Sequence, residues 1–324
     1  MKHNYQALIH IILVPTRPDK MQPMMSMTKE EIADAIQSFL SRCSIPYQKP
    51  QMDESFLELC YHEATKRGYM VEGEEELKPF IPQGVAIAFT AYAHLEDAAI
   101  QVWMALITAA AIYCDDRFLK DTGSVDVFCE NLLRRQPQAD RALNAFAELI
   151  VETPKYFPRL TANLMVASMF NFVNSIILDK QTLGMEVSAA ADNYPMFTRI
   201  MSGVAEFYGL AAFPVHLRVD SFIQALPSMM TFIVDVNDIL SFYKEELVGE
   251  SINYVSLWAK SRGCDKSQAL YAIIDETVEA HEKVIRILEK KPAALQAYYD
   301  FASGYVQFHT VLDRRYRLDE LMLS

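Results

Sequence analysis

The stretch "AAIQVWMALITAAAIYCDD" (98–116) decides the fold class. Up to its last two residues it is a nearly unbroken apolar run, at the lower end of the ~17–25 residues that a membrane-spanning helix needs. Acidic residues flank the run on both sides (Glu96 and Asp97, then Asp115 and Asp116), and no basic residue directly adjoins it. We therefore expect a buried helix at the centre of a large helical domain, with no stable membrane insertion.

The rest of the chain has the same helical character. Of its 324 residues 51% are hydrophobic, which is ample for a sizeable core. Only 10 residues are glycine and few hairpin turns are evident, which argues against an all-β fold. Apolar residues recur with the helical period of 3.6 over the ranges 27–43, 53–69, 82–95, 97–116, 124–135, 137–153, 155–180, 193–214, 218–248, 265–290 and 292–321.

These segments predict one all-α domain over residues 28–324. No linker, internal repeat or phosphate-binding glycine motif interrupts it. Thr28 and Glu31 have the spacing of a capping box, which predicts the start of the first helix. Residues 1–27, which contain several prolines and methionines, predict a poorly ordered extension, and residues 121–123 predict a loop.

The overall charge limits the classes of partner that we expect the protein to bind. A formal net charge of −12 disfavours non-specific binding to nucleic acid or to an anionic membrane. An anionic substrate would therefore need local cations or metal ions. The five cysteines contain no CxxC pair, so neither a disulfide framework nor a zinc site is expected. The seven histidines are scattered and are interpreted as ordinary core and surface residues, and without a convincing secretory signal we expect a cytoplasmic protein.

Asp115 and Asp116 end the most apolar helix. Two adjacent carboxylates at a helix C-terminus oppose the helix dipole and repel each other. One interpretation is that the helix simply meets solvent there. The other is that a divalent cation neutralises them, since magnesium prefers oxygen ligands and often binds together with substrate phosphate.

The segment "VDVNDILSFYKEE" (234–246) places oxygen donors on one helical stripe. Asn237, Ser241 and Glu245 are four residues apart, so an amide, a hydroxyl and a carboxylate point in nearly the same direction. Lys244 falls beside this stripe, whereas Asp238 points elsewhere and is expected to orient neighbours. A solvated polar face is the alternative, but it does not account for Asn and Ser, poor helix formers, at this spacing.

A third polar group is "DRRYRL" (313–318), the densest basic cluster in this acidic chain. Arg314, Arg315 and Arg317 could contact phosphate through their guanidinium groups, and Tyr316 could donate its hydroxyl. Taken alone, the cluster is also what a helix C-terminus needs to complement its dipole.

Together the three segments resemble the class I terpene cyclases, and more narrowly the fungal trichodiene synthase family. The resemblance rests on the aspartate pair, on "VNDILSFYKEE" and on "DRRYRL", in that order, and covers roughly residues 30–321. In addition, "NYPMFTRIMSG" (193–203) is similar to the family segment that carries a pyrophosphate-sensing arginine, which would be Arg199. The resemblance implies an all-α class I terpenoid synthase bundle around an apolar pocket.

The resemblance also implies the reaction of a sesquiterpene cyclase. Farnesyl diphosphate would lose pyrophosphate with the help of a cluster of three magnesium ions, and the resulting carbocation would cyclise. The implied site residues form two sets. The metal ligands would be Asp115, Asn237, Ser241 and Glu245. The diphosphate would be held by Arg199, Lys244, Arg315 and Tyr316. The catalytic residues would come from both sets, namely Asp115, Arg199, Arg315 and Tyr316.

Helical spacing from these residues suggests parts of the pocket wall. Stepping back by whole turns gives Thr108 and Ala111 before Asp115, Met230 and Ile233 before Asn237, and Phe308 before Arg315. Any of these side chains could equally be plain core.

One departure from the family concerns the aspartate segment. Relatives usually carry a third acid three or four residues after the first, whereas here the next acid is Asp121. We therefore assign Asp116, Asp121 and Asp238 only supporting roles. The alternatives are a non-catalytic or diverged helical relative, or a cyclase that takes a C10 or C20 diphosphate. A chain-elongating prenyltransferase is disfavoured because it would carry a second aspartate-rich motif, and a homodimer is left open.

Overall fold

The computed structural model describes residues 26–120, 122–188, 190–249 and 253–323, without the side chains of 118–120, 122, 313 and 314. Within these ranges every named secondary-structure element is a helix, and β-pairing is limited to an isolated bridge between Val71 and Glu74. The α-helices are α1 (Lys29–Arg42), α2 (Glu54–Lys66), α3 (Ile81–Ala91), α4 (Ala98–Lys120), α5 (Thr122–Asp126), α6 (Phe128–Arg134), α7 (Arg141–Tyr156), α8 (Arg159–Gln181), α9 (Tyr194–Ser202), α10 (Ala205–Ala211), α11 (Leu226–Val248), α12 (Tyr254–Arg262), α13 (Lys266–Leu288), α14 (Pro292–Val311) and α15 (Asp313–Tyr316).

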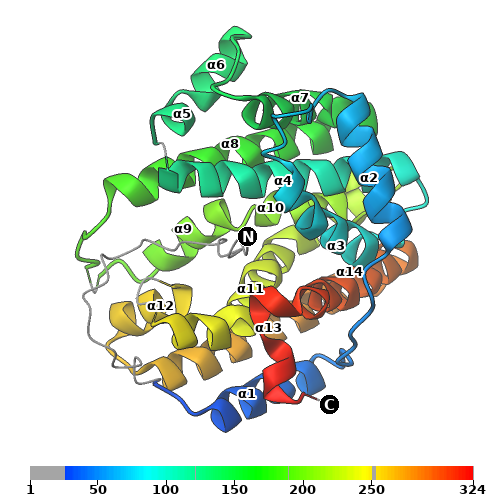
Figure 1. Cartoon of the computed structure of the whole chain (residues 1–324). Helices are drawn as coiled ribbons and strands as arrows, with labels where there is room; N and C mark the ends of the chain where they lie inside the picture. The colour runs from blue at the N-terminus through cyan, green and yellow to red at the C-terminus, as the bar shows by residue number, and fades with distance from the viewer. Residues whose placement is uncertain (1–25, 121, 189, 250–252, 324) are drawn as a thin grey trace.

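Four short 3₁₀ helices complete this part of the chain: η1 (Lys78–Phe80), η2 (Val219–Ser221), η3 (Ile223–Ala225) and η4 (Leu318–Leu321). Figure 1 shows the long helices stacked into one bundle, with α5 and α6 projecting at one end and α1 beside the C-terminal segment. The all-α fold predicted from helical periodicity is confirmed.

Several helices begin where the sequence supplies a capping side chain. The capping box predicted at α1 is present: Glu31 N donates to Thr28 Oγ1 at 3.1 Å, and Thr28 N donates to Glu31 Oε2 at 2.7 Å. These contacts satisfy backbone N–H groups that have no partner inside the helix. The other N-caps with a side-chain acceptor are Asp53, Asp140, Asn253 and Asp265.

The centre of the bundle depends on two close helix approaches at glycine. A Cβ at Gly304 of α14 would lie 2.1 Å from the Thr90 carbonyl oxygen of α3. A Cβ at Gly84 of α3 would lie 1.9 Å from the Ala105 carbonyl oxygen of α4. Because both clashes are with backbone atoms, the missing side chains let α3 sit tightly between α14 and α4.

The structure differs from the expected elements in several places, and the helices expected over 124–135, 218–248 and 292–321 are each divided. α12 was not predicted. Its own buried residues lie on several sides of the helix, so its sequence shows no single apolar stripe. α5 begins at Thr122, within the predicted loop at 121–123, while Asp121 itself lies outside the described residues. The helix expected over 193–214 is divided into α9 and α10 at Gly203 and Val204.

The N-terminal boundary also shifts slightly. Most of the predicted extension, residues 1–25, lies outside the described part of the chain. Ser26 and Met27 already belong to the fold: Met27 is buried, and Ser26 donates to the Glu246 carboxylate from its N (2.9 Å) and its Oγ (2.6 Å). The domain therefore starts no later than Ser26.

Three segments have the length and composition of a membrane span, namely Ala98–Arg117, Arg159–Gln181 and Ile223–Val248. Between 50% and 78% of the most apolar window of each is buried inside the protein. Much of this apolar surface is therefore used in packing the bundle.

Candidate active site

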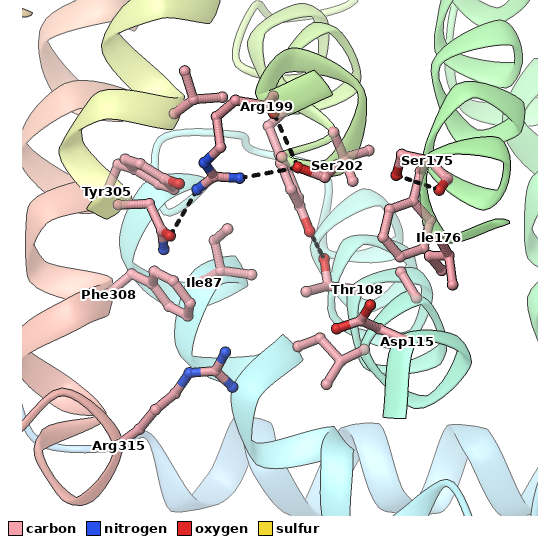
Figure 2. Close-up of a pocket in the computed structure, with 18 of the residues that line it drawn as sticks. Ile87, Thr108, Asp115, Ser175, Ile176, Arg199, Ser202, Tyr305, Phe308 and Arg315 are labelled. Carbon is pink, nitrogen blue, oxygen red and sulfur yellow. Dashed lines mark hydrogen bonds between the residues drawn. The ribbon is translucent and has the colours of Figure 1, made fainter. Parts of the chain in front are cut away.

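A cavity lies inside the bundle, with polar side chains on part of its wall (Figure 2). Its volume is about 110 Å³. A single water needs only about 10–15 Å³ on this measure, so the space can hold several waters and approaches the ~150 Å³ of a cavity that takes up benzene. The lining residues are Ile87, Thr108, Ala111, Ile112, Asp115, Phe172, Ser175, Ile176, Arg199, Ser202, Gly203, Val204, Tyr208, Val234, Asn237, Tyr305, Phe308, Arg315 and Tyr316.

The apolar wall agrees in part with the prediction from helical spacing. Thr108, Ala111 and Phe308 line the cavity as expected. Met230 and Ile233 do not, and Val234 occupies that part of the wall instead. The difference is one helical position, 100° on the helix, which places Val234 rather than Ile233 on the face that carries Asn237.

Arg199 is the most strongly held charge in the site. Its Nε lies 3.0 and 2.7 Å from the two carboxylate oxygens of Asp238, and both side chains are buried. Burial alone would lower the pKa of Arg199, but the Asp238 carboxylate outweighs it and keeps the guanidinium charged. Burial raises the pKa of Asp238 to about 6 against the opposing effect of Arg199. Asp238 thus orients Arg199, the kind of role expected from its place on the helix.

Asn237 connects Arg199 to the C-terminal segment. Its Oδ1 accepts from Arg199 Nη2 at 2.9 Å, and its Nδ2 lies 3.1 Å from His309 Nε2 and 3.5 Å from the Tyr316 hydroxyl. His309, on α14, is fully buried. Its part in the site was not predicted, since 72 residues separate it from Asn237 and no local spacing relates them.

Ser241 and Glu245 continue the α11 stripe beyond Asn237. Ser241 Oγ donates to Glu245 Oε1 at 2.5 Å, and both side chains are buried, although neither lines the cavity. The predicted alignment of these two residues is therefore present. Across the described residues no three His, Cys, Asp or Glu side chains gather as a metal-binding group. The donors on this stripe are instead an amide oxygen, a hydroxyl and one carboxylate, a set that suits a hard cation such as magnesium.

The aspartate pair is divided between two environments. Asp115 lines the cavity, and in Figure 2 its carboxylate points into it from the side opposite Arg315. Asp116 is buried and is not part of the lining. Asp121 lies outside the described residues, so its role stays a prediction.

Two of the predicted diphosphate-binding residues, Lys244 and Arg315, flank the ring of a third, Tyr316. Lys244 Nζ lies 5.5 Å and Arg315 Cζ 5.4 Å from the centroid of that ring, which is almost fully buried. Arg315 and Tyr316 line the cavity, whereas Lys244 stands beside it. Cations held over an aromatic face are oriented as well as attracted. Arg314 belongs to α15, but its side chain is outside the described part of the structure.

The break between α9 and α10 also forms part of the wall. Val204 has a left-handed backbone (φ 51°), which is costly for a β-branched residue. Gly203 has an ordinary φ, but a Cβ there would lie 2.7 Å from Val234 Cγ1 and 3.0 Å from Arg199 Nη1. The glycine therefore makes room for Arg199 against α11, and the valine changes the chain direction.

Comparison with known proteins indicates the same family as the sequence motifs. The sequence profile of the family described as "Trichodiene synthase (TRI5)" matches residues 84–323. Alpha-cuprenene synthase of Coprinopsis cinerea is 35% identical over 295 residues, covering 90% of each chain. Monoterpene synthase 25 of Postia placenta is 31% identical over 255 residues, covering 77% of this chain and 75% of the relative. Linalool/nerolidol synthase from Streptomyces clavuligerus, solved with 2-fluorogeranyl diphosphate, superposes with a TM-score of 0.61 at 16% identity, over 83% of this chain and 97% of that one.

These similarities decide the identity of the chain. The solved structure confirms the predicted fold, because it shares the arrangement of helices at an identity too low to show more than the fold. The family match covers well over half of the sequence and includes the segments "VNDILSFYKEE" and "DRRYRL". The protein is therefore a terpene synthase, and it belongs to the trichodiene synthase family.

Proposed function

We propose that this terpene synthase is a sesquiterpene cyclase that acts on farnesyl diphosphate. The supporting observation is the cavity itself: its wall is largely apolar, and Asp115, Asn237, Arg199, Arg315 and Tyr316 supply its polar groups. An apolar enclosure suits a long hydrocarbon tail, and cations suit a diphosphate. Loss of pyrophosphate would leave an allylic cation, which cyclises within the enclosure.

Terpene synthases as a class depend on metal ions. For this chain we propose magnesium, as a cluster of three ions, held by Asp115 from α4 and by Asn237, Ser241 and Glu245 from α11. When bound, these ions would stabilise the negative charge that develops on the departing pyrophosphate. The chain itself supplies oxygen donors from two helices, so the two sides of the site are held in place by the packing of the bundle.

Three cations and a hydroxyl would hold the diphosphate. Arg199 is already oriented by Asp238, so little side-chain freedom is lost when it binds. Lys244 and Arg315 flank the Tyr316 ring, where they can bond to phosphate oxygens while the phenol donates a further hydrogen bond. These groups account for anion binding by a chain whose formal net charge is −12.

The hydrocarbon part would lie against aromatic and aliphatic side chains. Phe172, Tyr208, Tyr305 and Phe308 all line the cavity. A ring face can stabilise a desolvated cation by ~1–2 kcal/mol, and an enclosed apolar wall keeps out water that would quench it. The Tyr208 hydroxyl, which donates to Thr108 Oγ1 at 3.2 Å, adds a polar point to this wall.

A shorter substrate is the second candidate. Monoterpene synthase 25 of Postia placenta is related to this chain over most of its length, and its name indicates a C10 product. A geranyl chain would fill less of the same cavity, so the two candidates differ in chain length and not in the initiating chemistry. We also propose a cytoplasmic enzyme without stable membrane insertion. At least half of each apolar window of the long helices is buried inside the protein, which supports the absence of insertion.

Product analysis tests the proposal. The purified protein is incubated with farnesyl, geranyl or geranylgeranyl diphosphate and magnesium, and volatile products are identified by gas chromatography and mass spectrometry. We expect a cyclic C15 product from farnesyl diphosphate and slower turnover of the other two. Preferential cyclisation of geranyl diphosphate would favour the second candidate, and no product from any of the three would contradict both.

A further inference from the structure

His309 makes the closest polar contact to the amide nitrogen of Asn237. The side chain is fully buried on α14, and its Nε2 lies 3.1 Å from Asn237 Nδ2. Its other ring nitrogen, Nδ1, lies 2.8 Å from the carbonyl oxygen of Tyr305, one turn earlier on the same helix. His309 does not line the cavity, so it would act on the substrate through lining residues that it contacts, and Asn237 is the one whose side chain it meets with a ring nitrogen.

These two contacts assign the tautomer of the imidazole. A carbonyl oxygen only accepts hydrogen bonds, so Nδ1 of His309 carries the proton and donates to Tyr305. A second proton on Nε2 would point at the NH₂ group of Asn237, because the oxygen of that amide already accepts from Arg199 Nη2, so the ring is neutral. Nε2 then has a free lone pair and accepts from Asn237.

The tautomer in turn assigns the orientation of the Asn237 amide. With its NH₂ group donating to His309, its oxygen faces Arg199 Nη2 at 2.9 Å. A 180° rotation of the amide would place the NH₂ group against the guanidinium and the oxygen against the lone pair of Nε2, which are two repulsive contacts. The Tyr316 hydroxyl, 3.5 Å from the amide nitrogen, lies at the outer limit of a hydrogen bond and holds it less firmly.

We propose that His309 is a positioning residue that fixes the Asn237 amide with its oxygen toward the site. This inference rests on the proposed function, in which that oxygen is a magnesium ligand. An asparagine free to rotate would present its NH₂ group part of the time and would bind no cation in that state. His309 therefore acts as the partner behind a ligand, the kind of contact whose loss weakens metal binding by about 10- to 100-fold.

Two substitutions separate positioning from packing. His309→Phe keeps a planar ring in the core but removes the acceptor. His309→Gln places an amide near the position of Nε2, and its oxygen can accept from Asn237. If the phenylalanine variant does not fold, His309→Leu takes its place. Thermal unfolding of the metal-free proteins checks that the fold is retained in each.

The readout is the magnesium-dependent binding of inorganic pyrophosphate, followed by calorimetry, which requires no turnover. We expect His309→Phe to weaken this binding by about 10- to 100-fold and His309→Gln to restore most of it. Unchanged binding in His309→Phe, or an equal loss in both variants, would overturn the inference.

The same His309 substitution in an Asn237→Asp variant makes the test more specific. In Asn237→Asp both ends of the side chain are oxygen, so no orientation is needed. His309→Phe should then cost little further affinity, and an equally large loss there would mean that His309 acts only through packing. A wild-type protein that binds no pyrophosphate at any magnesium concentration would instead contradict the proposed function, and the inference with it.

Discussion

Asp238 holds Arg199 through both of its carboxylate oxygens, at 3.0 and 2.7 Å from Nε, in a pair that is almost fully buried. The two residues lie 39 positions apart, on α11 and α9. Because Nε is used for this contact, the outer nitrogens of the guanidinium remain directed toward Asn237 and Ser202 on the cavity wall. The pair thus converts a flexible side chain into a fixed cation.

Removal of one partner should be more harmful than removal of both. Asp238→Ala leaves the Arg199 charge buried without its carboxylate, which typically costs ~3–5 kcal/mol of unfolding free energy. The double variant Arg199→Met, Asp238→Leu replaces the pair by apolar groups of similar size and should recover most of that loss. Urea unfolding measures both. Equal destabilisation in the single and the double variant would contradict a buried ion pair.

Turnover should respond differently from stability in the same series. The double variant lacks the cation proposed to bind diphosphate, so kcat/KM for farnesyl diphosphate should stay low although the fold recovers. A double variant with wild-type kcat/KM would remove Arg199 from the diphosphate site.

The α11 stripe can be tested by truncating its oxygen donors one at a time. Asn237→Ala, Ser241→Ala and Glu245→Ala should each lower kcat by at least ~100-fold, the scale of losing one electrostatic contact to a departing charge. Ser228→Ala is the matched control, on the same helix but outside the cavity lining. Chelation with EDTA should abolish turnover of the wild type, and added magnesium should restore it. Turnover that persists in both Asn237→Ala and Glu245→Ala would refute the metal stripe.

The glycine at position 304 should be irreplaceable for a different reason. A Cβ there would lie 2.1 Å from the Thr90 carbonyl oxygen and 2.7 Å from Ala91 Cα, and backbone atoms cannot rotate away. Gly304→Ala should therefore destabilise the fold toward the upper end of the ~1–3 kcal/mol typical of overpacking. The neighbouring Ser303→Ala, on the same helix, should change stability by no more than about 0.5 kcal/mol. Thermal unfolding compares the two, and equal midpoints would contradict the close approach of α14 and α3.

Features that depend on spacing within one helix were predictable from the sequence. The helical period places Asn237, Ser241 and Glu245 on one face, and the structure aligns the last two through a 2.5 Å hydrogen bond. Long apolar periodicity likewise predicted α4 and α11, because a buried helix needs little beyond its own sequence to be recognised.

Features that depend on contacts between distant helices were not predictable in the same way. Nothing local relates His309 to Asn237, and a scattered histidine looks like any other core residue until its partner is known. The sequence predicts a helix over 193–214, whereas the structure divides it: Val204 has a left-handed backbone, and Gly203 is small because α11 and Arg199 approach it. Family resemblance supplied the expected role of Arg199, which periodicity alone would have left as an ordinary buried arginine.

A buried histidine that does not line the cavity should make stability fall at acidic pH. His281 lies in the core, with Nδ1 2.8 Å from the Tyr298 hydroxyl, and burial lowers its pKa below the usual ~6.5 in spite of the nearby Cys43 carbonyl. Below pH 6.5 the unfolded chain binds a proton at this residue that the folded chain does not. The free energy of unfolding therefore decreases as the pH falls below 6.5, by up to ~1.4 kcal/mol per pH unit. His281→Gln keeps a hydrogen-bonding group but cannot be protonated, so its unfolding free energy should fall less steeply than that of the wild type between pH 6.5 and 5. Parallel curves for the two proteins in urea titrations would show that His281 is not the residue responsible.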